Sequence, residues 1–405
     1  MHFNAMMTPY RELLSRTHGG LEPIVVRAPG RINLIGEHTD YNGGLALPAA
    51  INRYIYVSVT WRDDEQVNMM AAEFPSKELA LSELYPCPGE WHTYIQGVAA
   101  VLLGWGYVLG GFNIHVCGDI PVGAGLSSSA ALCCGTVMAL DALFDLQLTR
   151  QEMALIAQQA EHTFAGVACG LMDQYACLFG KRGYALKLDF RTLQFEYVRL
   201  NLEFLDLVLL DSGVKHSLAS TEYNLRKMET GRALSRVQEK HATVERLRDC
   251  SLEQLYDEVL VADPVAYKRA KFFVEENKRV ETAAVALDRR KLTLMGDLLY
   301  ESHQGLTALY QVSCAELDLL IQLAKEEKSV VGARMMGGGF GGCTINLIEK
   351  KYKSCIGRLQ AEYERRTGIP LKAYRVMIAE GARVCNNREL RQIKYNEKSL
   401  EENYA

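Results

Sequence analysis

Residues 110–144 read GGFNIHVCGDIPVGAGLSSSAALCCGTVMALDALF, and no other stretch constrains the fold as strongly. Apolar residues from Phe112 to Val116 alternate with polar ones, as in a half-buried strand. A loop rich in glycine and proline follows over 118–125, and Ser127 opens a run of small apolar residues that we expect to be helical. In such a strand–loop–helix unit, backbone N–H groups and the helix dipole can bind an anion. The stretch predicts a phosphate-binding loop, and it also fits an ordinary capped helix after a tight turn.

Other nucleotide-binding motifs are absent from the sequence. No string fits the Walker A pattern G-x-x-x-x-G-K-[ST]. The glycine-rich run 337–342 formally satisfies G-x-G-x-x-G, but residues 343–348 have the pattern of a strand, whereas a dinucleotide-binding loop leads into a helix. The protein-kinase strings V-A-I-K, H-R-D and D-F-G are also missing. The loop at 118–125 is therefore predicted to be a phosphate site of a different kind.

The composition excludes several classes of protein. The 405 residues are 48% hydrophobic and 23% charged, which is typical of a chain with a large buried core. With 45 Lys and Arg against 49 Asp and Glu, the net charge of −4 argues against a dedicated nucleic-acid binder. The longest apolar stretch, 97–111, is too short to span a membrane, and no secretory signal is visible. Eleven cysteines without a C-x-x-C pair indicate a reducing, cytoplasmic location without structural disulfides.

Several motifs resemble those of a known family. Residues 121–131, PVGAGLSSSAA, resemble the second motif of the GHMP small-molecule kinases, and residues 336–343, MGGGFGGC, resemble the third. Residues 27–51, RAPGRINLIGEHTDYNGGLALPAAI, are similar to the sugar-kinase signature of the galactokinases. Two shorter blocks, GLMDQ at 170–174 and STEYN at 220–224, fit the same family. The resemblance covers roughly residues 25–384 in the family's order and spacing.

The resemblance implies a fold and a division of the chain. We expect a mixed α/β (α+β) structure with the two-domain GHMP kinase fold and an active site in the cleft between the domains. Residues 1–195 would form the N-terminal domain, with the sugar signature and the phosphate loop. Residues 196–384 would form the C-terminal domain, with the third glycine motif. Residues 385–405 are mostly polar, lie beyond the resemblance and are expected to form a loosely attached tail.

The resemblance also implies a site for ATP and Mg²⁺. The nucleotide would be held by the loop residues Gly123, Ala124, Gly125, Leu126, Ser127, Ser128 and Ser129, with Trp91 against the adenine. Ser129 and Glu161 would bind Mg²⁺, which prefers oxygen ligands. From its helical pattern alone, Glu161 reads as a solvated helix residue. It lies twelve positions before Asp173, as the metal-binding glutamate of the family does, and this favours the metal role.

Two residues are expected to carry the chemistry. By resemblance, Asp173 faces the sugar hydroxyl that attacks the γ-phosphate, and Arg31 lies beside it. A carboxylate is a weak base for an alcohol, so we expect proton transfer to come late in a loose transition state. The alternative interpretations are a helix N-cap for Asp173 and a surface arginine for Arg31. Arg31 lies between apolar strand residues, which favours a buried position.

The sugar would be bound by polar groups that follow the first apolar strand. The resemblance assigns Glu37, His38, Thr39, Asp40, Gly170 and Tyr223 to the sugar pocket. The string DYNGG at 40–44 is also typical of a hairpin turn. Carboxylates beside a turn fit both interpretations.

The resemblance implies an enzyme that transfers phosphate from ATP to the anomeric C1 hydroxyl of α-D-galactose. Its partners would be the sugar and ATP, with no nucleic acid or membrane, and a monomer is compatible with the sequence. A kinase for galacturonate, arabinose or N-acetylgalactosamine would have the same motifs. A non-catalytic sugar and ATP sensor is a further alternative, but the intact run LSSSAA at 126–131 favours the enzyme.

Overall fold

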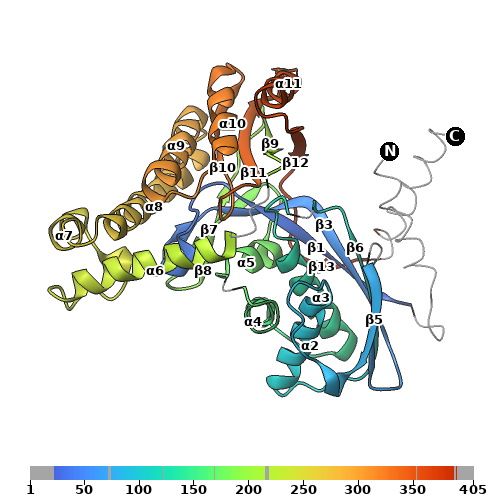
Figure 1. The fold of residues 1–405 in the computed structure, drawn as a ribbon. Helices are drawn as coiled ribbons and strands as arrows, with labels where there is room; N and C mark the ends of the chain where they lie inside the picture. Colours follow the sequence, from blue (N-terminus) through green and yellow to red (C-terminus); the bar gives the residue numbers. More distant parts are fainter. Residues whose placement is uncertain are drawn as a thin grey trace.

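The computed structural model describes residues 22–71, 74–121, 123–167, 169–214, 219–352, 354–386 and 389 (Figure 1). Three β-sheets and the helices packed on them make up this part of the chain. The alternating pattern after residue 111 forms a strand, and the serine run begins a helix, as predicted. The strand predicted at 343–348 is also present, which explains why the glycine run before it is not a dinucleotide fingerprint.

A six-stranded sheet forms the first half of the molecule, in the order β13-β1-β3-β6-β4-β5. Its strands are β1 (Ile24–Asn33), β3 (Pro48–Trp61), β4 (Gln66–Ala71), β5 (Phe74–Ala80), β6 (Phe112–Gly118) and β13 (Arg383–Val384). Neighbouring strands are antiparallel except β4 and β6. The register of β1 against β3 shifts between Pro29 and Arg31, and such a bulge redirects the side chains that follow it.

Among the described residues, this half contains the helices α2 (Thr93–Gly104), α3 (Ser128–Phe144), α4 (Arg150–Ala160) and α5 (Met172–Phe179). Helix α3 contacts β1 and β3 as well as the other three helices. Its residues from Ala130 to Leu140 are all buried, so its sequence is small and apolar on every side. A Cβ atom on Gly135 would lie 2.9 Å from the Val57 side chain, so α3 approaches the sheet closely because a glycine stands there.

The second half is built on an antiparallel sheet in the order β10-β11-β9-β12. Its strands are β9 (Leu205–Asp211), β10 (Val330–Met335), β11 (Cys343–Glu349) and β12 (Lys372–Val376), and its helices are α9 (Leu292–Gly305), α10 (Ala315–Glu326) and α11 (Cys355–Thr367). Helix α9 packs on β10 where Gly296 faces Gly332, and a Cβ atom on Gly332 would collide with the Gly296 backbone.

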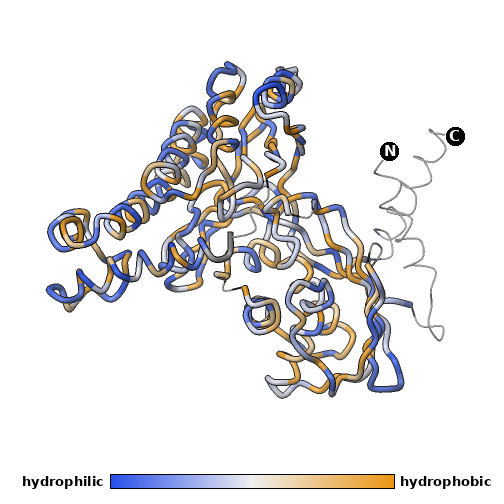
Figure 2. The backbone as a smooth tube through the Cα atoms, viewed as in Figure 1, coloured by the Kyte–Doolittle hydropathy of each residue, from blue (hydrophilic) through white to orange (hydrophobic). Residues whose placement is uncertain are grey.

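A helical arm and a small sheet complete the described structure. The arm contains α6 (Ala219–Gln238), α7 (Leu252–Glu258) and α8 (Pro264–Asp288), which extend to the left in Figure 1. The three-stranded sheet contains β2 (Leu45–Ala46), β7 (Tyr184–Asp189) and β8 (Gln194–Arg199). Helix α8 contacts both β2 and β8, so it connects the arm to the first half. Figure 2 shows hydrophilic residues along the outer turns of this arm.

One continuous apolar core passes through both halves. It includes Val26 and Val57 from the first sheet and Leu207 and Ile345 from the second, all nearly inaccessible to solvent. Burying this much apolar surface is the main favourable term in folding. Within the described residues, no helix is both long and apolar enough to cross a membrane. All eleven cysteines have free thiols.

The predicted mixed α/β class is confirmed by these sheets and helices. The division into 1–195, 196–384 and 385–405 stays a prediction. Strand β8 spans residue 195 and pairs with β7, so a division that keeps this hairpin whole would fall after residue 199. Most of the predicted tail lies outside the described residues. Its first residue, Cys385, donates its backbone N–H to the Val25 carbonyl oxygen at 2.8 Å.

Candidate active site

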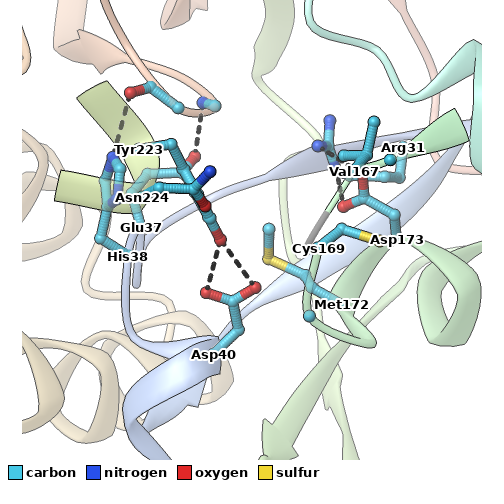
Figure 3. A pocket seen from close by; sticks show the side chains of 14 residues that line it. Arg31, Glu37, His38, Asp40, Val167, Cys169, Met172, Asp173, Tyr223 and Asn224 are labelled. Atoms are coloured by element: carbon cyan, nitrogen blue, oxygen red, sulfur yellow. Dashed lines mark hydrogen bonds and ion pairs between the residues drawn. The ribbon is translucent and has the colours of Figure 1, made fainter. Parts of the chain in front are cut away.

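A cavity of about 290 Å³ opens where β1, α5, α6 and the glycine run after β10 meet. Fourteen residues line it: Arg31, Glu37, His38, Asp40, Gly166, Val167, Cys169, Gly170, Met172, Asp173, Tyr223, Asn224, Gly337 and Gly338. Figure 3 shows Arg31 and Asp173 on one side of the view and Glu37, His38, Asp40 and Tyr223 on the other. The volume is at the small end of the range for ligand pockets, which suits a molecule of monosaccharide size.

A partly buried ion pair joins Arg31 to Asp173. The Arg31 Nε donates to Asp173 Oδ1 at 2.7 Å and Nη2 donates to Oδ2 at 3.0 Å, so the fork is bidentate. Arg31 is only 6% exposed, so the surface interpretation is wrong. Burial lowers the pKa of this guanidinium, but the charges of Asp173 and Glu37 outweigh burial and raise the pKa above its ordinary value. Asp173 lies in the first turn of α5 behind the N-cap Leu171, so the N-cap interpretation is also wrong.

The phosphate loop is attached to this ion pair. The Arg31 backbone N–H donates to the Leu126 carbonyl oxygen at 3.2 Å, and its Nη1 donates to the Gly125 carbonyl oxygen at 2.5 Å. Ser127 occupies the N-cap position of α3 with φ 60° but makes no capping bond. Its hydroxyl donates instead to Asp173 Oδ2. The loop, Arg31 and Asp173 therefore form one hydrogen-bonded unit at the start of α3.

Glu161 is a buried acid beside this unit. It is 3% exposed and begins a π-helical turn after α4, so the interpretation as a solvated helix residue is wrong. Burial raises its pKa to about 7, while hydrogen bonds from Ser129 and Gln174 act in the opposite direction. The Gln174 Nε2 donates to Glu161 Oε2 at 2.5 Å. A buried carboxylate in contact with a serine hydroxyl fits a Mg²⁺ site, because the cation would compensate the buried charge.

The turn after β1 presents Glu37 and His38 to the cavity. Glu37 Oε1 accepts hydrogen bonds from the Gly337 N–H at 2.8 Å and from Arg334 Nη2 at 3.0 Å. His38 Nε2 lies 3.0 Å from the Gly338 carbonyl oxygen, and Nδ1 lies 2.8 Å from the Tyr41 hydroxyl. Burial lowers the pKa of His38 to about 4, so the ring is neutral at physiological pH. Both residues thus attach the turn to the third glycine motif.

Asp40, Gly170 and Tyr223 form the adjoining wall. The Tyr223 hydroxyl lies 3.4 Å from each oxygen of the Asp40 carboxylate. Burial raises the pKa of Asp40 to about 6, and the negative charges of Asp173 and Glu37 add to this rise. A Cβ atom on Gly170 would collide with the Asp40 carboxylate, so a larger residue at this position would have to displace the Asp40 side chain. Asp40 also begins the short 3-10 helix Asp40–Asn42, so it lies both in a turn and in the cavity wall, and its role in sugar binding stays a prediction.

Of the predicted site residues, the loop 123–129 and Glu161 lie outside the cavity lining, and so do Thr39 and Trp91. The Thr39 hydroxyl lies 2.9 Å from the Gly36 carbonyl oxygen and 2.7 Å from that of Leu45, so it holds the turn together. Trp91 packs against Phe74 with ring centroids 6.1 Å apart.

The sequence interpretation missed several lining residues. Cys169, Met172 and Asn224 are each next to a predicted residue in the sequence, and this proximity was the available signal, whereas Gly166 and Val167 have no predicted neighbour. Gly337 and Gly338 belong to the third glycine motif, residues 336–343, and also line the cavity.

Comparisons with known proteins agree with this geometry. The model of the GHMP kinases N-terminal domain matches residues 93–181, and that of the GHMP kinases C-terminal domain matches residues 283–364. The galactokinase galactose-binding signature matches residues 14–60. That signature contains the turn of Glu37, His38 and Asp40.

Individual relatives cover nearly the whole chain. A galactokinase of Thermosipho africanus is 39% identical over 357 residues, which is 88% of this chain and 98% of the relative. One from Clostridium acetobutylicum is 38% identical over 367 residues, covering 89% and 94%. The crystal structure of Lactococcus lactis galactokinase complexed with galactose is 35% identical, with a TM-score of 0.88 over 94% of this chain and 99% of that one. The chain belongs to the galactokinases of the GHMP kinase family.

Proposed function

We propose that this protein is a galactokinase that uses ATP to phosphorylate the anomeric C1 hydroxyl of α-D-galactose, giving galactose 1-phosphate. The observation that carries the proposal is the position of Asp173. Its carboxylate is bonded through Arg31 and Ser127 to the phosphate loop, and it also lines the cavity that contains the galactose-binding signature. This arrangement supports the proposal, because a sugar hydroxyl in that cavity would lie next to the predicted site of phosphate binding.

Asp173 and Arg31 would act together on the reacting hydroxyl. The sugar oxygen attacks the γ-phosphorus, the bond between this phosphorus and the β–γ bridging oxygen breaks, and ADP leaves. As the new C–O–P bond forms, the hydroxyl proton becomes acidic and passes to the Asp173 carboxylate. Arg31 keeps a positive charge beside the transferring group, where negative charge is shared among the phosphoryl oxygens. Because Arg31 is fixed by four hydrogen bonds, little reorganisation is needed during transfer.

The nucleotide would lie on the loop from Gly123 to Ser128, with Trp91 beside the adenine. Gly125 has φ +74°, a conformation that favours glycine and directs the backbone of the loop. Ser129 and Glu161 would hold Mg²⁺, which neutralises charge on the ATP phosphates when bound. We also propose a cytoplasmic location, supported by the eleven free thiols.

A panel of sugar substrates tests whether galactose is the preferred substrate. Glu37 and Asp40 accept hydrogen bonds when ionised, and a buried acceptor left unpaired costs roughly 1–3 kcal/mol. We expect kcat/KM for galactose to exceed that for glucose by orders of magnitude, because glucose has its 4-hydroxyl in the other orientation. We expect a low kcat/KM for galacturonate, because the two acids would repel its carboxylate. Arabinose and N-acetylgalactosamine complete the panel. A higher kcat/KM for any other sugar would contradict the assignment to galactose.

The role of Asp173 is tested by Asp173→Asn. An amide cannot accept the hydroxyl proton, so we expect kcat to fall by about 10²- to 10⁴-fold. Galactose binding, measured by calorimetry, should stay within a few-fold, since the shape of the cavity is kept. Asp145→Asn, at the exposed C-cap of α3, is the control and should leave kcat unchanged. Near-normal turnover in Asp173→Asn would show that Asp173 does not take part in the chemical step.

The metal role of Glu161 is tested by titrating Mg²⁺ against the Glu161→Gln variant. The substitution keeps the size of the side chain but removes the charged ligand, so the Mg²⁺ concentration for half-maximal rate should rise about tenfold or more. Glu152→Gln is the matched control, because Glu152 is a partly exposed residue of α4 whose capping bond a glutamine can replace. An unchanged Mg²⁺ requirement in Glu161→Gln would assign Glu161 to packing alone.

A further inference from the structure

Arg334 is a buried cation behind the cavity. It lies on β10, is fully inaccessible to solvent, and is the largest of the fully buried side chains. It is not among the residues that line the cavity, so it does not touch a ligand there. Burying a guanidinium is unfavourable unless its charge and its N–H groups find partners. The partners of Arg334 therefore indicate what it does.

Three of these partners are backbone carbonyl groups. Arg334 Nη2 donates to the Asn33 oxygen at 2.6 Å and Nε donates to the Leu34 oxygen at 2.7 Å. Nη1 donates to the Met335 oxygen at 2.7 Å. Asn33 and Leu34 are at the end of β1, just before the sugar-binding turn. The arginine therefore fixes this end of β1 against β10, about 300 residues away in the chain.

The fourth partner is Glu37, which is 2% exposed and lines the cavity. Arg334 Nη2 donates to Glu37 Oε1 at 3.0 Å, and the Gly337 N–H donates to the same oxygen at 2.8 Å. Both hydrogen bonds described for this carboxylate thus end on Oε1. The nearby cation Arg31 has its fork on Asp173, so Arg334 is the cation hydrogen-bonded to Glu37 in the described part of the chain.

We propose that Arg334 is a positioning residue for the sugar site. It balances the charge of Glu37 and occupies Oε1, so that Oε2 is the oxygen presented to a sugar hydroxyl. This inference rests on the proposed function only in taking galactose as the ligand. An ordinary structural arginine would stabilise the fold without acting on the sugar through Glu37, and the two roles give different results in a double-mutant cycle.

The cycle combines Arg334→Met with Glu37→Gln, and calorimetry measures the Kd for galactose. Arg334→Met alone leaves a buried carboxylate without its cation, so we expect the Kd to rise roughly 30-fold or more. In the Glu37→Gln background there is no charge to balance, and the same change should raise the Kd by less than about threefold. An equal rise in both backgrounds would overturn the proposal, since it would show that Arg334 does not act through Glu37.

Folding is measured on the same four proteins by thermal unfolding. The three backbone hydrogen bonds are lost in both backgrounds, so a similar fall in Tm is expected in both. Where Arg334→Met does not fold, Arg334→Lys replaces it in the cycle, because lysine keeps the charge but lacks the planar fork. Its Kd for galactose should rise about tenfold with Glu37 present and little in the Glu37→Gln background. An unchanged Kd for Arg334→Lys would also overturn the proposal.

Arg269→Met is the matched control. Arg269 is 3% exposed and pairs with Glu229 at 2.8 Å, in a buried ion pair between α8 and α6 outside the cavity lining. Its loss should lower Tm while the Kd for galactose stays within about threefold, and a rise equal to that of Arg334→Met would contradict the proposal. Turnover of galactose by the unmodified enzyme tests the proposed function separately, because the cycle is measured as binding alone.

Discussion

The ion pair between Arg31 and Asp173 is the interaction on which the site depends. Arg31 is buried and Asp173 is partly exposed, and the bidentate fork compensates the cost of burying the guanidinium only while its geometry is kept. The same arginine bonds to the phosphate loop through its backbone N–H and through Nη1. The position of the loop, of the carboxylate and of the sugar cavity is therefore set by one residue, at the bulge of β1.

Close backbone approaches keep this arrangement compact. A Cβ atom on Gly30 would lie 2.8 Å from the Leu126 carbonyl oxygen, so the strand that carries Arg31 meets the phosphate loop without an intervening side chain. Gly170 meets the Asp40 carboxylate in the same way. Glu37 and His38 then bond to Gly337 and Gly338 of the third glycine motif. Small residues and paired charges together place polar groups from distant segments within reach of one ligand.

Much of the site could be predicted because its residues lie in short motifs. The strand, loop and helix around residues 110–144 follow from periodicity and glycine content, and the resemblance supplied Arg31, Asp173 and the acids of the turn. Three features could not be read from the sequence. Ser127 faces Asp173 instead of capping α3, Glu161 is buried, and Arg334 pairs with Glu37. Each depends on contacts between distant segments. In the sequence, nothing distinguishes Arg334 from an ordinary residue of a strand.

In the proposed mechanism, Asp173 and the predicted phosphate loop direct phosphate to the anomeric hydroxyl. The most direct measurement is a proton-coupled phosphorus NMR spectrum of the product made from galactose and ATP. A doublet from coupling to the single anomeric proton is expected, and selective decoupling of that proton should collapse it. Coupling to the two protons of C6, or inorganic phosphate as the only new species, would contradict the claim.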